Sequence, residues 1–200
     1  ITVIGGPLVH DVNDNQLLHD IVKFFDMKAK NLGAFHSSLR SFFPLDEVLI
    51  RQLNYELGRL PCTVLFDLNR PIEELWKNME KNARYGVRKG EKEGVVVEEA
   101  TSFDDLLAYY QIHVSTSNRL GIPLVSFQSL STLWRNFFSK GIFKVFLARY
   151  DTQPIAGVIA LRLHDKMWPY LAASFRQYWH LNPNLLTFWY ILRWAKDNGV

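Results

Sequence analysis

Hydrophobic residues along the chain follow two patterns: short apolar runs, and longer segments with an apolar position every three or four residues. The short runs predict strands, at 2–4, 34–38, 63–67, 95–98, 143–149, 155–163 and 167–173. The longer segments predict helices with one buried face, at 15–31, 45–56, 72–88, 102–120, 126–139 and 183–198. Strands that alternate with helices in this way predict an α/β fold with a mixed, partly parallel sheet.

Two of the predicted helices carry start signals. Ser102 precedes an apolar repeat with Asp104 and Asp105 in its first turn, where free backbone N–H groups and the helix dipole favour oxygen atoms and negative charge. Asn182 followed by Pro183 predicts the cap and first residue of the last helix. Polar turns at 151–154 and 164–166 predict hairpins. From residue 95 onward the expected order is therefore strand, helix, helix, an antiparallel meander of three strands, and helix.

Composition allows one or two domains and indicates no particular partner. The chain has 200 residues, is 48% hydrophobic and has a formal net charge of +3, with a pI near 9.0. This mild basic excess falls short of the clustered charge of a nucleic-acid-binding domain.

Cysteine, histidine and hydropathy exclude several classes of protein. Cys62 is the sole cysteine, so we expect no internal disulfide, and no Cys/His cluster has the spacing of metal ligands. The apolar stretch 185–195 is interrupted by Thr187 and Arg193 and is shorter than the roughly 20 residues that span a bilayer. The first residues lack the pattern of a signal peptide. We therefore expect a cytoplasmic protein without a metal cofactor or an integral membrane segment.

The segment 72–88 places basic residues beside its apolar face. Lys77, Lys81, Arg84 and Arg88 recur at helical spacing. Such a stripe can hold phosphate groups, because arginine donates paired hydrogen bonds to phosphate oxygens. It can also be a solvated helix face, because acidic residues four positions away can pair with it. By itself the pattern favours the solvated face.

The connection between the strand at 167–173 and the last helix is a second candidate for anion binding. A helix that begins directly after a strand leaves N–H groups free at its start, and Ser174, Arg176 and His180 lie in this connection. A structural loop with polar surface residues explains them equally well. Residues 174–181 contain no glycine. The chain also has no phosphate loop, nucleophile elbow or dinucleotide fingerprint, so hydrolase, kinase and dehydrogenase activities lose support.

Spaced residues, mostly in the second half, resemble the FemABX family of aminoacyl and acyl transferases. The matching positions are Glu74-Leu75-Trp76, Arg84, Val87-Arg88-Lys89, Gly94-Val95, Thr116, Arg119, Gly121, 156–163, 170–174, Leu185-Leu186, Trp194-Ala195 and Gly199. In the first half, Gly5-Gly6-Pro7 and Asp67-Leu68 resemble parts of the family's first domain.

The resemblance implies two tandem acetyltransferase-like domains, that is, GNAT-like mixed sheets with flanking helices. Residues 1–70 would form the C-terminal part of the first domain, 71–94 a basic linker helix, and 95–200 the N-terminal and central part of the second. The chain would then begin midway through the first domain and end where the family continues into further catalytic elements.

The resemblance also implies an activity, because FemABX proteins transfer amino acids from aminoacyl-tRNA to amines of peptidoglycan precursors. In acetyltransferase-like folds the donor lies beside a splayed strand whose N–H groups stabilise the oxyanion, and the strand at 167–173 would be one side of that site. The absence of glycine from 174–181 favours aminoacyl-tRNA or another non-CoA donor over acyl-CoA as co-substrate, with no other cofactor.

Six residues are expected at the site. They are Lys81, Arg84 and Arg88 for an anionic acceptor or tRNA phosphates, Tyr170 and Ser174 for lining the acceptor site, and Arg176 for a second phosphate. No carboxylate or histidine stands out over Tyr170 or water as the group that accepts the proton of the amine.

Two alternatives remain open. One is a GNAT-like acetyl or acyl transferase that uses acyl-CoA or another acyl donor. The other is a non-catalytic interaction module that self-associates through an exposed sheet edge. A lipid-linked acceptor would place the protein at the inner face of the membrane as a peripheral protein. A nucleic-acid-binding domain is a weaker interpretation, because the basic residues cluster in one helix.

Overall fold

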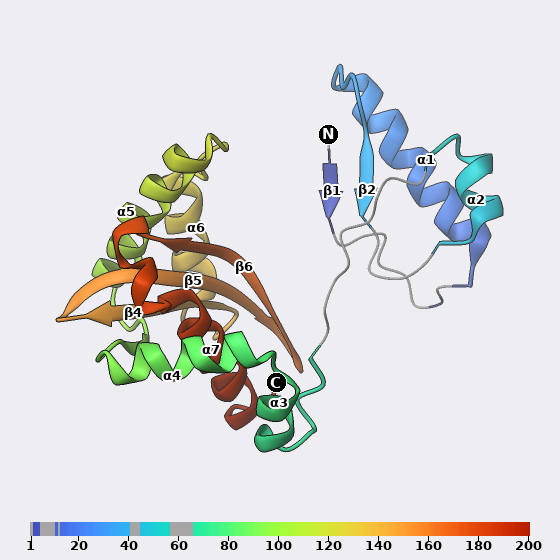
Figure 1. The fold of residues 1–200 in the computed structure, drawn as a ribbon. Coiled ribbons are helices and arrows are strands. Elements are labelled where there is room, and N and C mark those ends of the chain that lie inside the picture. The colour runs from blue at the N-terminus through green and yellow to red at the C-terminus, as the bar shows by residue number, and fades with distance from the viewer. Residues whose placement is uncertain (1, 5–10, 12, 41–44, 57–65) are drawn as a thin grey trace. The chain divides into compact units, whose positions relative to one another are not determined.

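The computed structural model describes residues 2–4, 11, 13–40, 45–56 and 66–200. The chain divides into two compact units, Ile1–Val64 and Leu65–Val200 (Figure 1). The strand predicted at 63–67 falls largely outside the described residues, and residues 66 and 67 are not in a strand. In the described parts of both units, no helix is long and apolar enough to cross a membrane.

The described residues of the first unit include two short parallel strands and two helices. Strands β1 (Thr2–Ile4) and β2 (Ser38–Arg40) pair side by side, and the helices are α1 (Asn15–Asn31) and α2 (Glu47–Gln52). The helix predicted at 45–56 is therefore shorter than expected.

The strand predicted at 34–38 was wrong for all but its last residue. Gly33 has a φ of 71°, and the Ala34 N–H donates to the Ala29 carbonyl at 3.0 Å. This bond closes the end of α1 in the manner of a Schellman motif. Residues 33 and 34 thus terminate the helix, and pairing with β1 begins only at Ser38.

The second unit is built on a four-stranded antiparallel sheet in the order β3-β4-β5-β6. The strands are β3 (Val96–Glu99), β4 (Phe143–Tyr150), β5 (Gln153–Leu163) and β6 (Lys166–Ser174). The predicted meander is confirmed, with turns at 151–152 and 164–165. Every pair in this sheet is antiparallel, and the parallel pair among the residues that the structure describes is β1 with β2.

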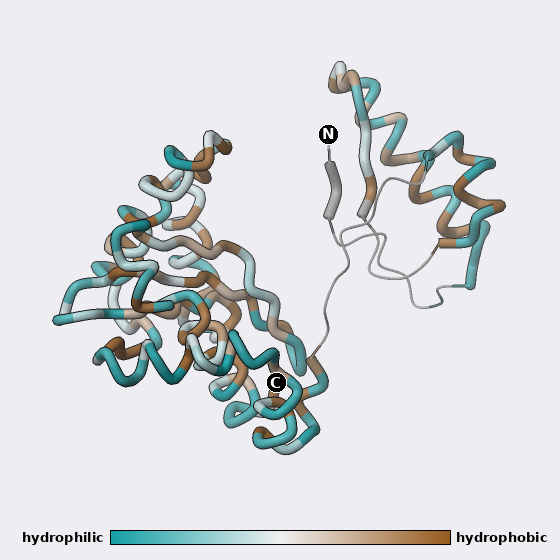
Figure 2. The backbone as a smooth tube through the Cα atoms, in the orientation of Figure 1, coloured by the Kyte–Doolittle hydropathy of each residue, from teal (hydrophilic) through white to brown (hydrophobic). Residues whose placement is uncertain are grey.

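Helices cover both faces of this sheet (Figure 1). On one face, α5 (Phe103–Leu120) and α6 (Phe127–Phe137) enclose a core that includes Tyr109, Phe143 and Ile159. On the other, α7 (Pro183–Asp197) packs against Phe146 and Val158, and α3 (Ile72–Asn78) and α4 (Lys81–Lys92) pack against α7. Figure 2 shows that hydrophilic residues dominate α3 and α4, as expected for helices that bury only one face.

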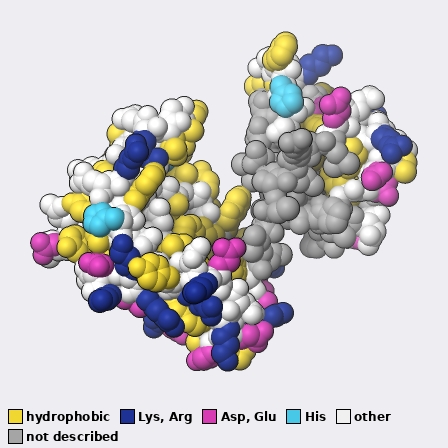
Figure 3. Space-filling view, in the orientation of Figure 1, with side chains coloured by type: hydrophobic (Ala, Val, Ile, Leu, Met, Phe, Trp, Pro, Cys, Tyr) yellow, Lys and Arg dark blue, Asp and Glu magenta, His cyan; other side chains and the backbone are white. Residues whose placement is uncertain are grey.

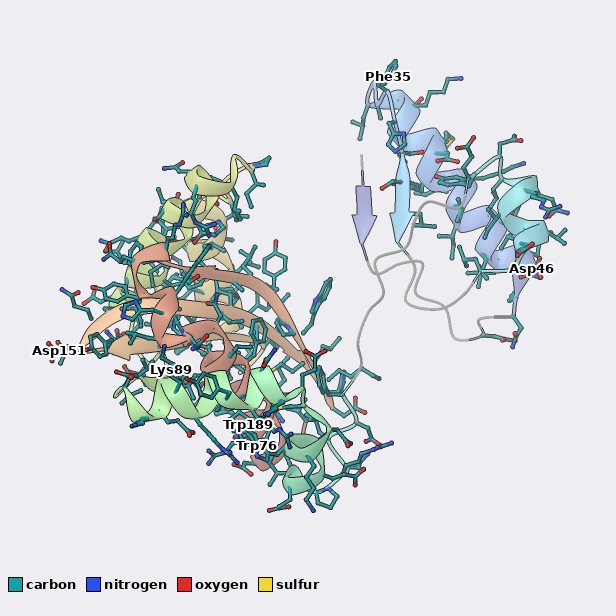
Figure 4. The ribbon with its side chains drawn as sticks, viewed as in Figure 1. Phe35, Asp46, Trp76, Lys89, Asp151 and Trp189 are labelled. Atoms are coloured by element: carbon teal, nitrogen blue, oxygen red, sulfur yellow. The ribbon has the colours of Figure 1, made fainter. Side chains whose placement is uncertain are left out.

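The single helix predicted at 72–88 is instead two helices, α3 and α4. The chain is extended at Met79 and Glu80, with ψ angles near 146°. No glycine or proline marks this break, so local sequence could not reveal it. The break lets each helix pack separately: Trp76 of α3 lies against Trp189 of α7, ring centroids 4.8 Å apart (Figure 4), and α4 meets the start of α7 through its glycines.

Gly86 and Gly90 form the contact face of α4. A Cβ atom at Gly90 would lie 3.0 Å from the Leu181 carbonyl oxygen and 3.3 Å from the Leu186 Cδ2 atom. A Cβ at Gly86 would meet the end of the Leu185 side chain and lie 3.4 Å from the Asn182 Cγ atom. The absence of side chains therefore lets α4 approach Leu181 and the start of α7 closely. Helix α4 extends to Lys92, past the predicted end at Arg88.

We expect Gly90→Ala to lower the free energy of unfolding by about 1 to 2 kcal/mol, although alanine is the better helix former. The new methyl group would press on a backbone carbonyl, which cannot move without displacing the start of α7. Gly86→Ala is the matched control, because the Leu185 side chain is 37% exposed and can rotate away. Urea denaturation should show little loss for Gly86→Ala, and an equal loss for both variants would contradict the packing argument.

The start of α5 confirms the predicted cap. The Ser102 hydroxyl accepts from the Asp105 N–H at 3.2 Å, and the Asp105 carboxylate accepts from the Ser102 N–H at 3.0 Å. The same carboxylate receives Arg149 of β4 at 2.6 Å. Asn182 occupies the N-cap position of α7 as predicted, but it adopts a left-handed conformation and its side chain makes no capping hydrogen bond. Pro183 is the first residue of α7 as expected.

Protonation of Asp105 should make the protein less stable in acid. Burial raises the pKa of Asp105, but hydrogen bonds from Ser102 and Thr101 together with the Arg149 guanidinium outweigh it, so the pKa lies below its usual 3.8. A depressed pKa stabilises the fold fully above the unfolded value, and this stabilisation is lost as pH falls through the folded pKa. The difference in melting temperature between the wild type and Asp105→Asn should be constant from about pH 7 to 5 and shrink below about pH 4. Asp104→Asn, an exposed change in the same turn, should show no such pH dependence.

Candidate active site

Strand β6 forms one of the two edges of the second sheet, and no strand among the described residues pairs with its outer side. Trp168 and Tyr170 on this strand are 45% and 41% exposed. The register with β5 shifts here: Ile159 lies opposite Leu171, and Ala160 lies opposite Pro169. Tyr170 is therefore the extra residue of a β-bulge, a feature that redirects a side chain and is common beside active sites.

The C-terminal end of β6 is fixed by a small hydrogen-bond network. Thr116 of α5 donates its hydroxyl to the Ser174 carbonyl at 3.2 Å and accepts from the Ser174 N–H at 3.1 Å. The Ser174 hydroxyl accepts from the Trp179 indole N–H at 2.9 Å and from the Asn184 side chain at 3.1 Å. Ser174 is only 4% exposed. It therefore joins strand, connection and helix, and a substrate could reach its hydroxyl only after local movement.

Two guanidinium groups lie on the indole ring of Trp179. The Arg119 guanidinium carbon is 4.7 Å from the ring centroid and that of Arg176 is 6.0 Å away. Neither arginine pairs with a carboxylate of the described residues. Cation–π contacts orient these groups without using their N–H donors. The end of β6 thus offers two positive charges, close together and available to an anion.

The connection from β6 to α7 is a 3₁₀ helix, η1 (Arg176–Leu181). The Tyr178 N–H donates to the Phe175 carbonyl and the Asn182 N–H to the Trp179 carbonyl. These N–H groups are already used within the chain. The segment therefore differs from an open glycine-containing loop that directs its N–H groups at a pyrophosphate.

The basic residues of α4 make their contacts with α3 and not with the residues at the end of β6. Arg84 donates to the Lys77 carbonyl at 3.4 Å, and the Arg88 guanidinium lies 5.4 Å from the Trp76 ring centroid. Both arginines thus contact α3, while Lys81 is exposed. The break between α3 and α4 takes Lys77 out of the helical repeat with the other three. The structure brings Ser174 and Arg176 together through Trp179, with Tyr170 on the same strand, and gives Lys81, Arg84 and Arg88 no contact with them.

A buried histidine lies close behind the β6 edge. His113 of α5 is 4% exposed, and its ring stacks on Tyr109 with centroids 6.0 Å apart. The Tyr109 hydroxyl donates to the Leu171 carbonyl of β6 at 3.1 Å. Burial lowers the pKa of His113, which favours the uncharged imidazole near neutral pH. Its Nε2 atom and the Ser117 hydroxyl have no hydrogen-bond partner among the described residues.

Sequence reasoning missed three contributors to this arrangement. Trp179, Asn184 and His113 were not expected at the site, and Thr116 and Arg119 entered only as matches to a family turn. The one available signal was the polar segment 115–119 at the end of a long amphipathic helix, which a solvated helix end would also show.

Other parts of the second unit are weaker candidates for a binding site. A shallow depression of about 590 Å³ lies at the opposite edge of the sheet, lined by Gly94, Val96, Arg149 and Asp151. The one basic residue of this lining, Arg149, is already paired with Glu98 and Asp105. Within the described parts of the chain, no three His, Cys, Asp or Glu side chains are grouped to hold a metal.

The sequence from residue 77 to residue 200 matches the family described as acetyltransferase (GNAT) domains. The chain belongs to this family. Acyl transfer is the general chemistry of GNAT domains, and the predicted GNAT-like α/β fold is confirmed.

Solved structures share the fold of this chain over all or nearly all of its length. The crystal structure of FemX has a TM-score of 0.71 with 12% sequence identity, over 100% of this chain and 69% of FemX. The C-terminal DUF2156 domain of an Agrobacterium fabrum protein named as a lysylphosphatidylglycerol synthetase has a TM-score of 0.55 with 12% identity, over 93% of this chain and 58% of that one. No curated protein sequence matches this chain. The predicted resemblance to FemABX proteins is thus confirmed for a GNAT-family chain with the fold of FemX.

Proposed function

We propose that this GNAT-family chain transfers an aminoacyl group from aminoacyl-tRNA to an amine of a peptidoglycan or other cell-envelope precursor. The observation that carries the proposal is the connection after β6, where a 3₁₀ helix stands in place of an open glycine loop. Arg176 of this connection and Arg119 of α5 lie at its Trp179 ring, and neither forms an ion pair with another described residue. The similarity of the whole chain to FemX supports a tandem architecture of the FemABX kind.

The donor is inferred from how a phosphate can be held at η1. Coenzyme A needs several backbone N–H groups around its pyrophosphate, and two of those near η1 are bonded to carbonyls. Guanidinium groups instead bind phosphates through side-chain donors, and they tolerate the varied geometry of a nucleic-acid backbone. Arg119 and Arg176 suit a tRNA phosphate or the phosphate of a precursor better than the pyrophosphate of acyl-CoA.

The reaction would take place along the open edge of β6. The acceptor amine attacks the acyl carbon of the donor ester, the carbonyl oxygen gains negative charge, and the tRNA hydroxyl leaves with a proton. Backbone N–H groups on the free side of β6 are suited to the oxyanion. Tyr170 lies about 13 Å along the strand from Ser174, at about 3.3 Å per residue. It is our candidate for contacting the amine, with water as the immediate proton acceptor.

Two basic regions have separate roles in this proposal. Arg176, with Arg119, binds a phosphate beside the donor site. Lys81, Arg84 and Arg88 on α4 bind an anionic acceptor or a more distant part of the tRNA. Residues 1–70, 71–94 and 95–200 correspond in this proposal to the end of a first GNAT-like domain, a basic linker, and the beginning and centre of a second. The enzyme would work in the cytoplasm, at the inner face of the membrane if the acceptor is lipid-linked.

Ligand-induced thermal stabilisation distinguishes the possible donors. A ligand that binds only the folded state must raise the melting temperature, by an amount that grows with its concentration over Kd. We expect a shift with aminoacyl-tRNA or a peptidoglycan precursor and none with acetyl-CoA. A shift with acetyl-CoA alone would instead assign the chain to acyl-CoA-dependent transferases. Concentration-dependent association with no ligand shift would favour a non-catalytic module that pairs through the β6 edge.

Variants of the proposed site test its residues one region at a time. Tyr170→Phe should reduce single-turnover transfer by about tenfold or more, whereas Tyr150→Phe, a half-exposed tyrosine at the end of β4, should not.

Arg176→Gln should weaken tRNA binding by about tenfold. Arg84→Ala with Arg88→Ala should weaken acceptor binding, with the exposed Arg135→Ala of α6 as control. If the α4 double variant binds acceptor as tightly as the wild type, the role of α4 is wrong while that of Arg176 still stands.

A further inference from the structure

An exposed apolar turn lies at the C-terminal end of helix α5, whose last residue is Leu120. It comprises Leu120–Gly121–Ile122–Pro123–Leu124, and we call it the apolar turn. Its three aliphatic side chains, Leu120, Ile122 and Leu124, are 54%, 50% and 41% exposed. Figure 3 shows hydrophobic side chains at the surface of this end of the second unit. Single exposed leucines are ordinary, but three within five residues form a patch that calls for a partner.

The apolar turn is held in place by the end of the helix. Gly121 has a φ of 63° and its N–H donates to the Asn118 carbonyl. The Ile122 N–H donates to the Ser117 carbonyl at 3.2 Å, and Pro123 restricts the chain further. The next residues, Val125 and Phe127, pack on the core. Both ends of the turn are thus anchored, so its side chains cannot simply fold back onto the core.

Positive charge and an aromatic ring adjoin the apolar turn. Arg119 immediately precedes it and stacks on Trp179, which also carries Arg176. Trp179 is 43% exposed. The surrounding chain lacks acidic residues: 106–150 contains five basic residues and no acidic one, and 166–196 contains four basic residues and no acidic one. An anionic surface that approaches this end meets no opposing carboxylate from these segments.

We propose that the apolar turn with Arg119, Arg176 and Trp179 docks on the surface of an anionic lipid bilayer. Leu120, Ile122 and Leu124 enter the headgroup region and the indole of Trp179 lies at the interface. The positive charges of Arg119 and Arg176 attract the anionic lipids at longer range, while their N–H donors stay available to the phosphate of the proposed transfer. Interfacial anchors of this kind combine aliphatic insertion with attraction to anionic lipids, and tryptophan favours the boundary between water and lipid.

The aliphatic residues favour a membrane over a nucleic acid as the partner. Arginines beside an aromatic ring would suit either, but Leu120, Ile122 and Leu124 gain nothing from a sugar-phosphate backbone, whereas transfer into a lipid interface removes their surface from water. Docking does not depend on which acyl donor is used. It would bring the β6 edge to the membrane, where a lipid-linked acceptor would be found.

Vesicle co-sedimentation of the full chain tests this proposal. Vesicles of phosphatidylcholine alone are compared with vesicles containing about one-third phosphatidylglycerol, with the expectation of at least tenfold tighter binding to the anionic vesicles. Ile122→Asp with Leu124→Asp should weaken that binding by tenfold or more. Leu163→Asp is the matched control, because Leu163 is a 62% exposed leucine at the end of β5, and it should bind as the wild type does.

Separate outcomes overturn the docking proposal and the proposed transfer. No binding to anionic vesicles, equal binding to neutral ones, or an equal loss for Leu163→Asp rejects docking. A chain that binds tRNA but fails to bind anionic vesicles would reject docking and leave the proposed transfer intact. The aspartate variants change no residue of the proposed transfer site, so their transfer to a soluble acceptor should be unchanged even when vesicle binding is lost.

Discussion

Replacing Thr116 by valine should lower the free energy of unfolding by about 2 to 4 kcal/mol. Valine keeps the shape of threonine but removes the hydroxyl that donates to the Ser174 carbonyl and accepts from the Ser174 N–H. Both backbone groups are buried, and each would lose its partner at a cost of about 1 to 3 kcal/mol. Chemical denaturation of the full chain measures the loss, and Thr116→Ser, which restores the hydroxyl, should recover most of it.

A second threonine provides the matched control. Thr132 of α6 is exposed and donates its hydroxyl to the Gln128 carbonyl at 2.8 Å, within its own helix. Thr132→Val should change the free energy of unfolding by less than about 0.5 kcal/mol, because water can replace the lost bond. Equal effects of the two substitutions would show that Thr116 does not hold the end of β6.

Gly157→Ala should destabilise the protein by about 3 kcal/mol, at the upper end for overpacked cores. Gly157 lies in the middle of β5, where a Cβ atom would come within 2.8 Å of the Tyr109 ring and 2.9 Å of the Phe146 carbonyl oxygen of β4. The ring is fully buried and the carbonyl belongs to the neighbouring strand. Neither can move without disturbing the sheet, so the added methyl group cannot be accommodated cheaply.

A Gly→Ala substitution at a less crowded position separates the effect of crowding from that of the substitution itself. Gly86→Ala adds it against the flexible, partly exposed Leu185 side chain and should cost little. If thermal and urea unfolding give Gly157→Ala a stability within about 1 kcal/mol of the wild type, the packing of Tyr109 over β5 is looser than the distances imply. Because the Tyr109 hydroxyl bonds to Leu171, that outcome would also weaken the case for an ordered β6 edge.

The candidate site was only partly accessible from sequence. Tyr170, Ser174 and Arg176 could be singled out because they lie in or directly after one predicted strand. Their neighbours Thr116 and Arg119 are more than fifty residues away in the chain, and only folding brings them to Ser174 and Trp179. The stripe on α4 shows the opposite error: regular spacing suggested one continuous surface, but the helix breaks at Met79 and Glu80.

Local chemistry in the sequence determined the elements whose ends carry strong signals. Ser102 with Asp105 fixed the start of α5, polar turns fixed the meander of β4, β5 and β6, and Pro183 fixed the start of α7. In these cases the preference is carried by residues adjacent in the chain, through caps, turns and a restricted φ angle. Hydrophobic patterning alone was enough to predict the α/β class and to predict no membrane span.

Tertiary structure decided what depends on contacts between distant segments. Whether Gly90 ends a helix or allows two helices to touch depends on Leu181 and Leu186. Whether Ser174 is a free hydroxyl or a buried junction depends on Thr116, Trp179 and Asn184. Burial and hydrogen bonding across the fold determine these environments, and neither is encoded in the spacing of residues within one element. The sequence thus identified the strand that carries the candidate site, and packing determined which of its side chains can meet a substrate.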